Sequence, residues 1–257
     1  MFTEERHQTI LDYLTEKGRV TVLELAQRLQ VSDDTVRRDL RVLDELGFLQ
    51  KTHGGAVSLE VPRMARAQRA QVLPQVKQQL AQAVIEQIEP GQTLMLDAGQ
   101  SLLAVAQALP DIPLTVITHA LDIANALSQR PQVRLILAGG LWDARQRLFT
   151  GAQTVAQVQS LRADWAIMGA CAVHEKLGLT ASDAADAEVK RAMLAVSAQA
   201  MLVADHSKTG RSEPFFVCPM QQFSHWFTDR TPDWVSAPVG LRVIGAGLVS
   251  ANTEKTA

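Results

Sequence analysis

Residues that tie a chain to an oxidising compartment or to a membrane are scarce in this sequence. Cysteine occurs twice in 257 residues, at Cys171 and Cys218, which excludes a disulfide framework and favours two small buried hydrophobic side chains. No apolar run approaches the roughly 20 residues of a membrane-spanning helix, and the first residues lack the apolar core of a signal peptide. We therefore expect a cytoplasmic protein without membrane contact.

A charge of one sign is lacking as well. The formal net charge is -2, from 25 Lys and Arg against 27 Asp and Glu, so the overall composition does not indicate a nucleic-acid partner. A surface for nucleic acid would have to be a local patch. What the chain does have is 47% hydrophobic residues over 257 positions, which is enough for a sizeable core and for two domains.

The amino-terminal part of the chain shows three helical patterns and then a short hairpin. Thr21 is a suitable N-cap for the second helix and Ser32 for the third, and Gly47 is a suitable stop. The stretch FLQKTHGGAVS follows, with a short strand, a turn at Gly54-Gly55 and a second short strand. Three helices closed by a small hairpin predict a winged helix-turn-helix domain over residues 1–58.

Two kinds of side chain alternate around the third helix. Val36, Leu40 and Leu43 recur at helical spacing and should face the core, which turns the intervening arginines outward. A guanidinium group can hold guanine or phosphate through two hydrogen bonds, so the pattern suits the major groove of DNA. The wing would contact the DNA backbone or the minor groove. The expected DNA contacts are Ser32, Thr35, Arg37, Arg38, Arg41, Lys51 and His53.

An alternative is that these arginines only neutralise their neighbours. Arg37 lies three residues after Asp34, and Arg41 has Glu45 at i+4, so intrahelical ion pairs of about a few tenths of a kcal/mol would be possible. Up to Val57 the sequence holds eight Lys and Arg against ten Asp and Glu, so composition does not choose DNA. The position of the cations favours DNA, because they concentrate on the third helix and the wing.

A linker composition marks residues 59–75, LEVPRMARAQRAQVLPQ, which contain Pro62 and Pro74. From residue 76 onward, apolar segments alternate with helical patterns, which predicts an α/β domain with a mostly parallel sheet over residues 76–250. The expected strands are TLMLD, LTVIT, VRLILAGG, WAIMGA, AMLVAD, HWFTD and LRVIGAG. The polar tail, residues 251–257, is expected to be disordered.

Small and polar residues follow several of the expected strands. LDAGQS, THA, AGG, GA at 169–170 and DHSK each come at the end of an apolar segment, and ligands of open parallel sheets gather at the carboxyl ends of the strands. Each segment alone is compatible with an ordinary turn. Several at one edge favour an anionic small ligand, because backbone amides at helix starts bind anions.

The amino-terminal motifs together resemble the DNA-binding signature of the DeoR family of bacterial transcriptional regulators. A serine opens the third helix, TVRRDL follows at 35–40, Leu43 and Gly47 keep the L-x-x-x-G spacing, and HGGA ends the wing at 53–56. The resemblance implies that the arginine pair faces DNA and that Asp39 orients a neighbouring arginine. Which arginine contacts a base and which a phosphate stays open at this point.

The segments LAGG, GLTASD with AEVKRAM, and DHSKTGR are similar to the DeoR sensor domain. That domain shares its fold with ribose-5-phosphate isomerase and usually responds to sugar phosphates. By this resemblance the effector-site candidates are Asp97, Gly99, Gln100, Ser101, Thr118, His119, Gly139, Gly140, Asp183, Glu188, Lys190 and Lys208.

Two segments depart from the family pattern. Its D-x-G-T-T-T loop reads DAGQSL here, with Gln100 and Leu102 in place of threonines, and its usual T-N reads Thr118-His119. Fewer hydroxyl donors would weaken phosphate binding, whereas a protonated His119 would restore one donor.

The leading hypothesis is a DNA-binding transcriptional regulator, a repressor of a carbohydrate-metabolism operon. It would act as a homo-oligomer, a dimer or tetramer, on double-stranded DNA and respond to a sugar phosphate or related anionic metabolite. The alternative is a sugar-phosphate isomerase or deaminase with a DNA-binding appendage, in which Glu188 and Lys190 act as acid and base. A third reading is a regulator without any ligand.

No catalytic residue, metal or cofactor is expected, since Cys171 and His174 form only a lone C-x-x-H pair.

Overall fold

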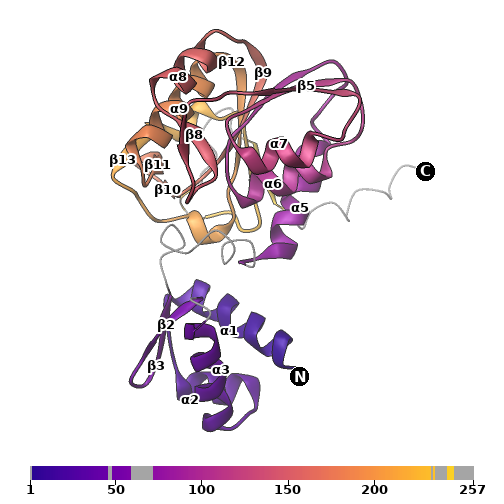
Figure 1. Ribbon diagram of the computed structural model, residues 1–257. Coiled ribbons are helices and arrows are strands. Elements are labelled where there is room, and N and C mark those ends of the chain that lie inside the picture. Colours follow the sequence, from indigo (N-terminus) through magenta and orange to yellow (C-terminus); the bar gives the residue numbers. More distant parts are fainter. Residues whose placement is uncertain (1, 46–47, 59–71, 233, 235–241, 246–257) are drawn as a thin grey trace, which may run out of the picture. The chain divides into compact units, whose positions relative to one another are not determined.

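Two compact units make up the chain in a computed structural model, Met1–Pro74 and Gln75–Ala257 (Figure 1). The structure describes residues 2–45, 48–58, 72–232, 234 and 242–245. The expected helix stop at Gly47, most of the expected linker at 59–75 and the expected disordered tail at 251–257 lie outside these residues. The last two residues of the expected linker, Pro74 and Gln75, are the first two of helix α5.

The amino-terminal unit has the three helices and the hairpin expected of a winged helix-turn-helix. Thr21 caps the second helix as predicted: its hydroxyl accepts a hydrogen bond from the Glu24 N–H at 3.2 Å, and the Glu24 carboxylate accepts one from the Thr21 N–H at 2.8 Å. Ser32 caps the third helix by accepting from the Thr35 N–H at 3.2 Å. The helices are α1 (Thr3–Lys17), α2 (Val22–Leu29) and α3 (Asp33–Glu45), and the hairpin strands are β2 (Leu49–Thr52) and β3 (Gly55–Ser58).

A third strand, β1 (Arg19–Thr21), adds to this hairpin and was not expected from the sequence. It pairs with β3, so that the antiparallel order is β1-β3-β2. Three residues are too few for a periodic pattern, and only the pairing partner makes them a strand. Val36, Leu40 and Leu43, which were predicted to face the core, are buried, and so are Ile10 and Leu14 of α1 and Leu25 of α2.

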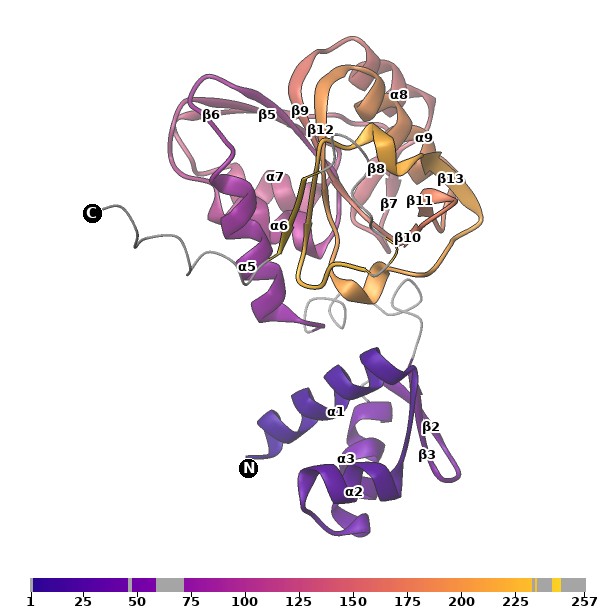
Figure 2. The same ribbon diagram turned by 180° about the vertical axis from the view of Figure 1, so that it is seen from behind.

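Seven parallel strands form the sheet of the carboxy-terminal unit (Figure 2). Its strand order is β15-β14-β12-β9-β4-β5-β6. All seven expected strands are present: β4 (Thr93–Leu96), β5 (Leu114–Thr118), β6 (Val133–Leu137), β9 (Ala163–Gly169), β12 (Ser197–Val203), β14 (His225–Thr228) and β15 (Arg242–Gly245). From β4 the chain builds outward to β5 and β6, and then returns to the other side of β4 with β9. The crevice between β4 and β9 is therefore the point where the strand order reverses, the usual ligand position in such sheets.

Helices cover both faces of this sheet (Figures 1 and 2). One apolar cluster joins the sheet to α5 (Pro74–Ile85), α6 (Gln100–Ala108) and α7 (Leu121–Leu127). The other joins it to α8 (Ala152–Gln159) and α9 (Ala184–Ala195). Each buried strand thus carries apolar side chains toward both layers, which is why the strands read as near-continuous apolar runs.

Short antiparallel pieces complete the second layer, and the sequence had not indicated them. A hairpin joins β7 (Leu141–Asp143) to β8 (Leu148–Thr150), and a small sheet has the order β10-β11-β13. The strands of the small sheet are β10 (Ala172–His174), β11 (Gly178–Ala181) and β13 (Phe215–Cys218), and two 3-10 turns lie at His206–Lys208 and Met220–Gln222.

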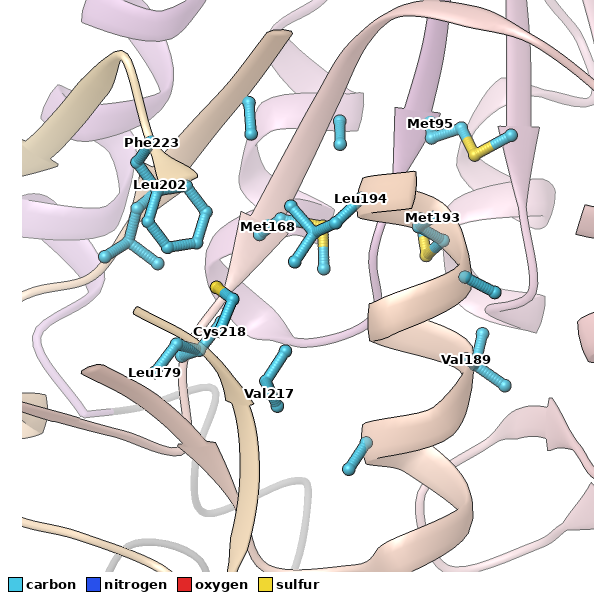
Figure 3. Packing of buried hydrophobic residues seen from close by; sticks show 14 of the residues in the cluster. Met95, Met168, Leu179, Val189, Met193, Leu194, Leu202, Val217, Cys218 and Phe223 are labelled. Carbon is cyan, nitrogen blue, oxygen red and sulfur yellow. The ribbon is translucent and has the colours of Figure 1, made fainter. Parts of the chain in front are cut away.

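This small sheet packs against the main sheet and α9 (Figure 3). Val217 and Cys218 of β13 lie in one buried cluster with Met168 and Leu202 of the main sheet and Met193 of α9. Burial raises the pKa of the Cys218 thiol to about 12, so it stays protonated and behaves as a small apolar side chain, as expected. Cys171 differs from the expectation because it is only half-buried.

Among the helices that the structure describes, none combines the length and the apolar character that crossing a membrane would require.

Candidate DNA interface and effector site

The three arginines of α3 are exposed, as the spacing of the apolar residues predicted. Arg37, Arg38 and Arg41 make no hydrogen bond or ion pair with any other residue that the structure describes. The alternative pairs, Arg37 with Asp34 and Arg41 with Glu45, are not formed. The guanidinium groups therefore keep their full hydrogen-bonding capacity for an external anion.

Asp39 has different partners from those expected. Its carboxylate does not hold a neighbouring arginine of α3; it binds Arg6 and His7 of α1 instead. The side chain is buried, so its charge is removed from the helix surface that carries the arginines. The sequence did not show this pairing because 33 residues separate Arg6 from Asp39.

The wing presents Lys51 and His53 on its exposed side. Its close packing against β1 explains one of the two glycines in the HGGA motif. A Cβ on Gly55 would lie 1.9 Å from the Val20 carbonyl oxygen, whereas a Cβ on Gly54 would meet nothing within 4 Å. Only Gly55 is required for this approach of backbone to backbone.

In the second unit, a group of titratable side chains gathers at the crevice between β4 and β9. Asp97 follows β4 directly, and its Oδ2 accepts hydrogen bonds from the Gly169 N–H at the end of β9, at 3.0 Å, and from the Lys190 ammonium of α9. Asp186 Oδ1 lies 3.6 Å from Lys190 Nζ, and His119 Nε2 lies 4.0 Å from Asp97 Oδ1. One carboxylate thus ties together β4, β9 and α9. We call Asp97, His119, Asp186 and Lys190 the buried cluster.

Burial and charge act in opposite directions on the members of the buried cluster. Burial alone would lower the pKa of Lys190, but the charges of Asp186 and Asp97 outweigh it and raise the pKa above its usual value, so the amine stays an ammonium. Burial lowers the pKa of His119 to about 4, against the attraction of Asp97. Burial also raises the pKa of Asp186 to about 6 despite the nearby ammonium. At neutral pH His119 is therefore uncharged and offers one donor and one acceptor, in place of the imidazolium considered from the sequence.

Several polar atoms of the buried cluster lack a hydrogen-bond partner within the described part of the chain. They are Asp97 Oδ1, Asp186 Oδ1 and both ring nitrogens of His119. Asp97, His119 and Asp186 each offer one ligand atom within 4.8 Å of the others, which is the spacing of a metal site. The Lys190 ammonium already supplies a cation between the two carboxylates, so the arrangement does not require a metal for charge balance.

The other predicted effector residues take separate positions around the carboxyl edge of the sheet. Thr118 is buried, and its hydroxyl is used internally, donating to the Leu96 carbonyl at 2.8 Å and accepting from the Ala120 N–H at 3.2 Å. Gly139 and Gly140 follow β6, Lys208 lies in the 3-10 turn after β12, and Gly99 is the N-cap of α6, ahead of Gln100 and Ser101. Leu102, the apolar replacement in the loop, is fully buried in the core.

Two of the candidates on α9 point away from the buried cluster. Asp183 is exposed and caps α9 by accepting from the Asp186 N–H at 2.9 Å. Glu188 is also exposed, whereas Lys190 is buried, so the helix separates the proposed acid–base pair.

Sequence reasoning missed Asp186, and it noted Gly169 only within GA at 169–170, not as an effector-site candidate. Asp186 precedes Lys190 by four residues, the spacing that puts two helical side chains on one face, and this signal was available. For Gly169 the signal was its position directly after an apolar segment, which did not show its contacts. A Cβ there would lie 2.9 Å from Leu102 Cδ2 and 3.1 Å from the Ala98 carbonyl oxygen, so only the folded chain shows why glycine is needed.

Family models match both units of the chain. Residues 6–61 match the model described as a DeoR-like helix-turn-helix domain, and residues 74–230 match the DeoR C terminal sensor domain.

Similar proteins include several regulators. The chain is 31% identical over 235 residues to the HTH-type transcriptional repressor GlcR of Bacillus subtilis (strain 168), covering 91% of each chain. It is 33% identical over 233 residues to the glycerol-3-phosphate regulon repressor of Escherichia coli (strain K12), covering 89% of this chain and 91% of the relative. The L-fucose operon activator of Haemophilus influenzae is 29% identical over 231 residues, with 89% and 93% covered. Among solved structures, ribose 5-phosphate isomerase A of Methanocaldococcus jannaschii superposes with a TM-score of 0.40 at 13% identity, over 53% of this chain and 54% of that chain.

Proposed function

Because the chain belongs to the DeoR family of transcriptional regulators, we propose that it represses a carbohydrate-metabolism operon and that a sugar phosphate bound in the second unit controls it. The chain is a regulator of transcription and not the isomerase or deaminase considered as the alternative. Two of the relatives are repressors, and one of them is named for the glycerol-3-phosphate regulon. These names support repression and a phosphorylated effector.

The observation that carries the DNA-binding role is the set of three exposed, unpaired arginines on α3. Within the described residues they have no partner in their own chain, and they project from a helix sized for the major groove. One such helix contacts too few base pairs for selective binding, so we propose a homo-oligomer, at least a dimer, on double-stranded DNA in the cytoplasm.

The observation that carries the effector role is the unsatisfied hydrogen-bonding capacity of the buried cluster. A buried donor or acceptor without a partner costs about 1–3 kcal/mol, and the cluster holds four such atoms at the reversal point of the sheet. A sugar would satisfy them through its hydroxyl groups. The Lys208 side chain and the amides at Gly99 and Ser101 are our candidates for the phosphate.

Genomic footprinting followed by a ligand screen tests this function. The bound genes would identify the pathway, and sugar phosphates of that pathway should raise the melting temperature of the full chain. We expect Lys208→Ala to abolish that rise, whereas Lys176→Ala, at an exposed lysine of the β10–β11 turn, should leave it intact. A melting shift that persists in Lys208→Ala would remove this lysine from the site, and binding sites away from carbohydrate genes would contradict the proposed regulon.

A further inference from the structure

Asp39 lies next to Arg38 in sequence but on the opposite side of α3, where α1 passes. The Arg6 guanidinium group donates two hydrogen bonds to this carboxylate. Nε donates to Oδ2 at 2.5 Å, and Nη2 donates to Oδ1 at 3.0 Å. His7 Nε2 lies 3.1 Å from the same Oδ1. The side chains of Asp39, Arg6 and His7 are only 5%, 12% and 18% exposed.

We propose that Arg6, His7 and Asp39 form a latch that positions the recognition helix: it sets the rotation of α3 against α1 and thereby the direction of Arg37, Arg38 and Arg41. The three latch residues act through the arginines and do not contact DNA themselves.

Further contacts between the two helices are apolar. Ile10 and Leu14 of α1 pack with Val36, Leu40 and Leu43 of α3 in one apolar cluster. Apolar packing is non-directional and tolerates small rotations and slides. A bidentate guanidinium–carboxylate pair is planar and directional, so it selects one rotation among those that the apolar residues allow. Buried ion pairs in general contribute little net stability, and setting register is their best-attested role.

The latch also removes a negative charge from the DNA-facing helix. Burial alone would raise the pKa of Asp39, but the hydrogen bonds from Arg6 and His7, together with their charges, outweigh it and hold the pKa below its usual value. The carboxylate is therefore ionised, and the Arg6 side chain of α1 balances its charge. Without Arg6, the unbalanced negative charge of Asp39 would lie close to the α3 arginines and would weaken their attraction for phosphate.

The test compares two DNA duplexes of equal length, the fragment recovered by genomic footprinting and a scrambled version of it. With full-length protein, Asp39→Asn should weaken binding to the recovered fragment at least about tenfold, while binding to the scrambled duplex changes by less than about twofold. Asp33→Asn is the matched control, because it removes the same charge from an exposed position on α3, and it should not weaken specific binding.

Two further variants test the proposal if Asp39→Asn folds poorly. Arg6→Lys retains the charge but loses the fork, and it should lose specific affinity while melting like the wild type. In the double variant Arg6→Ala/Asp39→Asn, the loss should not exceed that of the worse single variant, because the two residues act as a unit. Equal losses on both duplexes, undiminished specific affinity, or fully additive losses would each overturn the latch.

Discussion

At the scale of single residues, the buried cluster shows how surroundings assign charge. Lys190 stays an ammonium because two carboxylates face it, whereas His119, a few ångströms away, is held neutral by burial. The buried cluster therefore carries its positive charge on Lys190, between two carboxylates, and offers uncharged hydrogen-bonding atoms at His119. This arrangement suits the hydroxyl groups of a ligand and not its anionic group, because two carboxylates face the single ammonium.

The neutral state of His119 predicts a specific pH dependence of stability. Its folded pKa is about 4, below the usual 6.5, so its contribution is complete above about pH 6.5 and is lost as the pH falls toward 4. The free energy of unfolding of the wild type minus that of His119→Asn should therefore rise with pH across this window, by on the order of 3 kcal/mol.

Denaturant titrations at pH 4.5 and pH 7 measure this difference. All four tryptophans of the chain, at positions 142, 165, 226 and 234, belong to the second unit, so their fluorescence reports that unit alone. The raised pKa of Asp186 acts in the opposite direction, since its stabilisation is lost as the pH rises through about 6, and subtraction of the two curves removes it. A difference that does not vary with pH would contradict a neutral His119.

A second residue-scale prediction concerns Arg38. Arg38→Ala should weaken operator binding by about 1–3 kcal/mol, the usual cost of a lost bidentate contact. Arg28→Ala is a suitable control, because that guanidinium lies over the Tyr13 ring, 4.6 Å from its centroid. Electrophoretic mobility shifts or fluorescence anisotropy with labelled operator would measure the loss. Undiminished affinity in a folded Arg37→Ala/Arg38→Ala variant would reject α3 as the recognition helix.

At the scale of elements, the wing depends on how closely β3 approaches β1. Gly55 pairs with Thr21, and there is no room for a side chain beside the Val20 carbonyl. The preceding Gly54 belongs to the turn and faces open space. The two glycines of one motif therefore have different reasons for their presence.

Substitution of alanine at Gly54 and at Gly55 distinguishes a glycine in an open turn from a glycine that close packing requires. Gly55→Ala should destabilise the amino-terminal unit by about 3 kcal/mol or more, because backbone atoms must move to admit the methyl group. Gly54→Ala should change stability by less than about 1 kcal/mol. Hydrogen exchange of the backbone amides of β1 and β3 would measure both, and equal protection in the two variants would refute the packing argument.

At the scale of the whole molecule, selective DNA binding requires two recognition helices. Among the described residues of the amino-terminal unit, α3 is the one helix that carries several exposed arginines, so the proposed homo-oligomer follows from the number of base pairs that one helix can contact. Effector binding would then act by changing the arrangement of the paired helices, which is a change between two states of the oligomer.

Truncated operators test this requirement. Deleting one half-site from the footprinted operator should reduce affinity at least about tenfold, and sedimentation of the free protein should give a mass of two chains or more. Full affinity for a single half-site, or a monomeric mass at the concentrations used for binding, would contradict the oligomer.

Local patterns in the sequence were sufficient for the helices of the amino-terminal unit and for the strands of the main sheet. The N-caps at Thr21 and Ser32, the apolar stripe of α3 and the seven apolar strands were all readable, because each depends on neighbours within one or two turns or on strand period. The outward direction of the arginines followed from the same stripe. Short pieces such as β1 and the β10-β11-β13 sheet were not readable, since strands of three or four residues are too short for a periodic pattern.

Only the tertiary structure decided which distant residues meet and with what charge. Asp39 takes its partner from 33 residues away and Asp97 takes Lys190 from 93 residues away, and no periodicity connects such positions. Burial then set the protonation of His119 and Asp186, which depends on the removal of water and on neighbouring charges and therefore exists only in the closed fold. The chain's own sequence determined where its helices and strands begin and what they expose; long-range packing determined the electrostatics that the sites use.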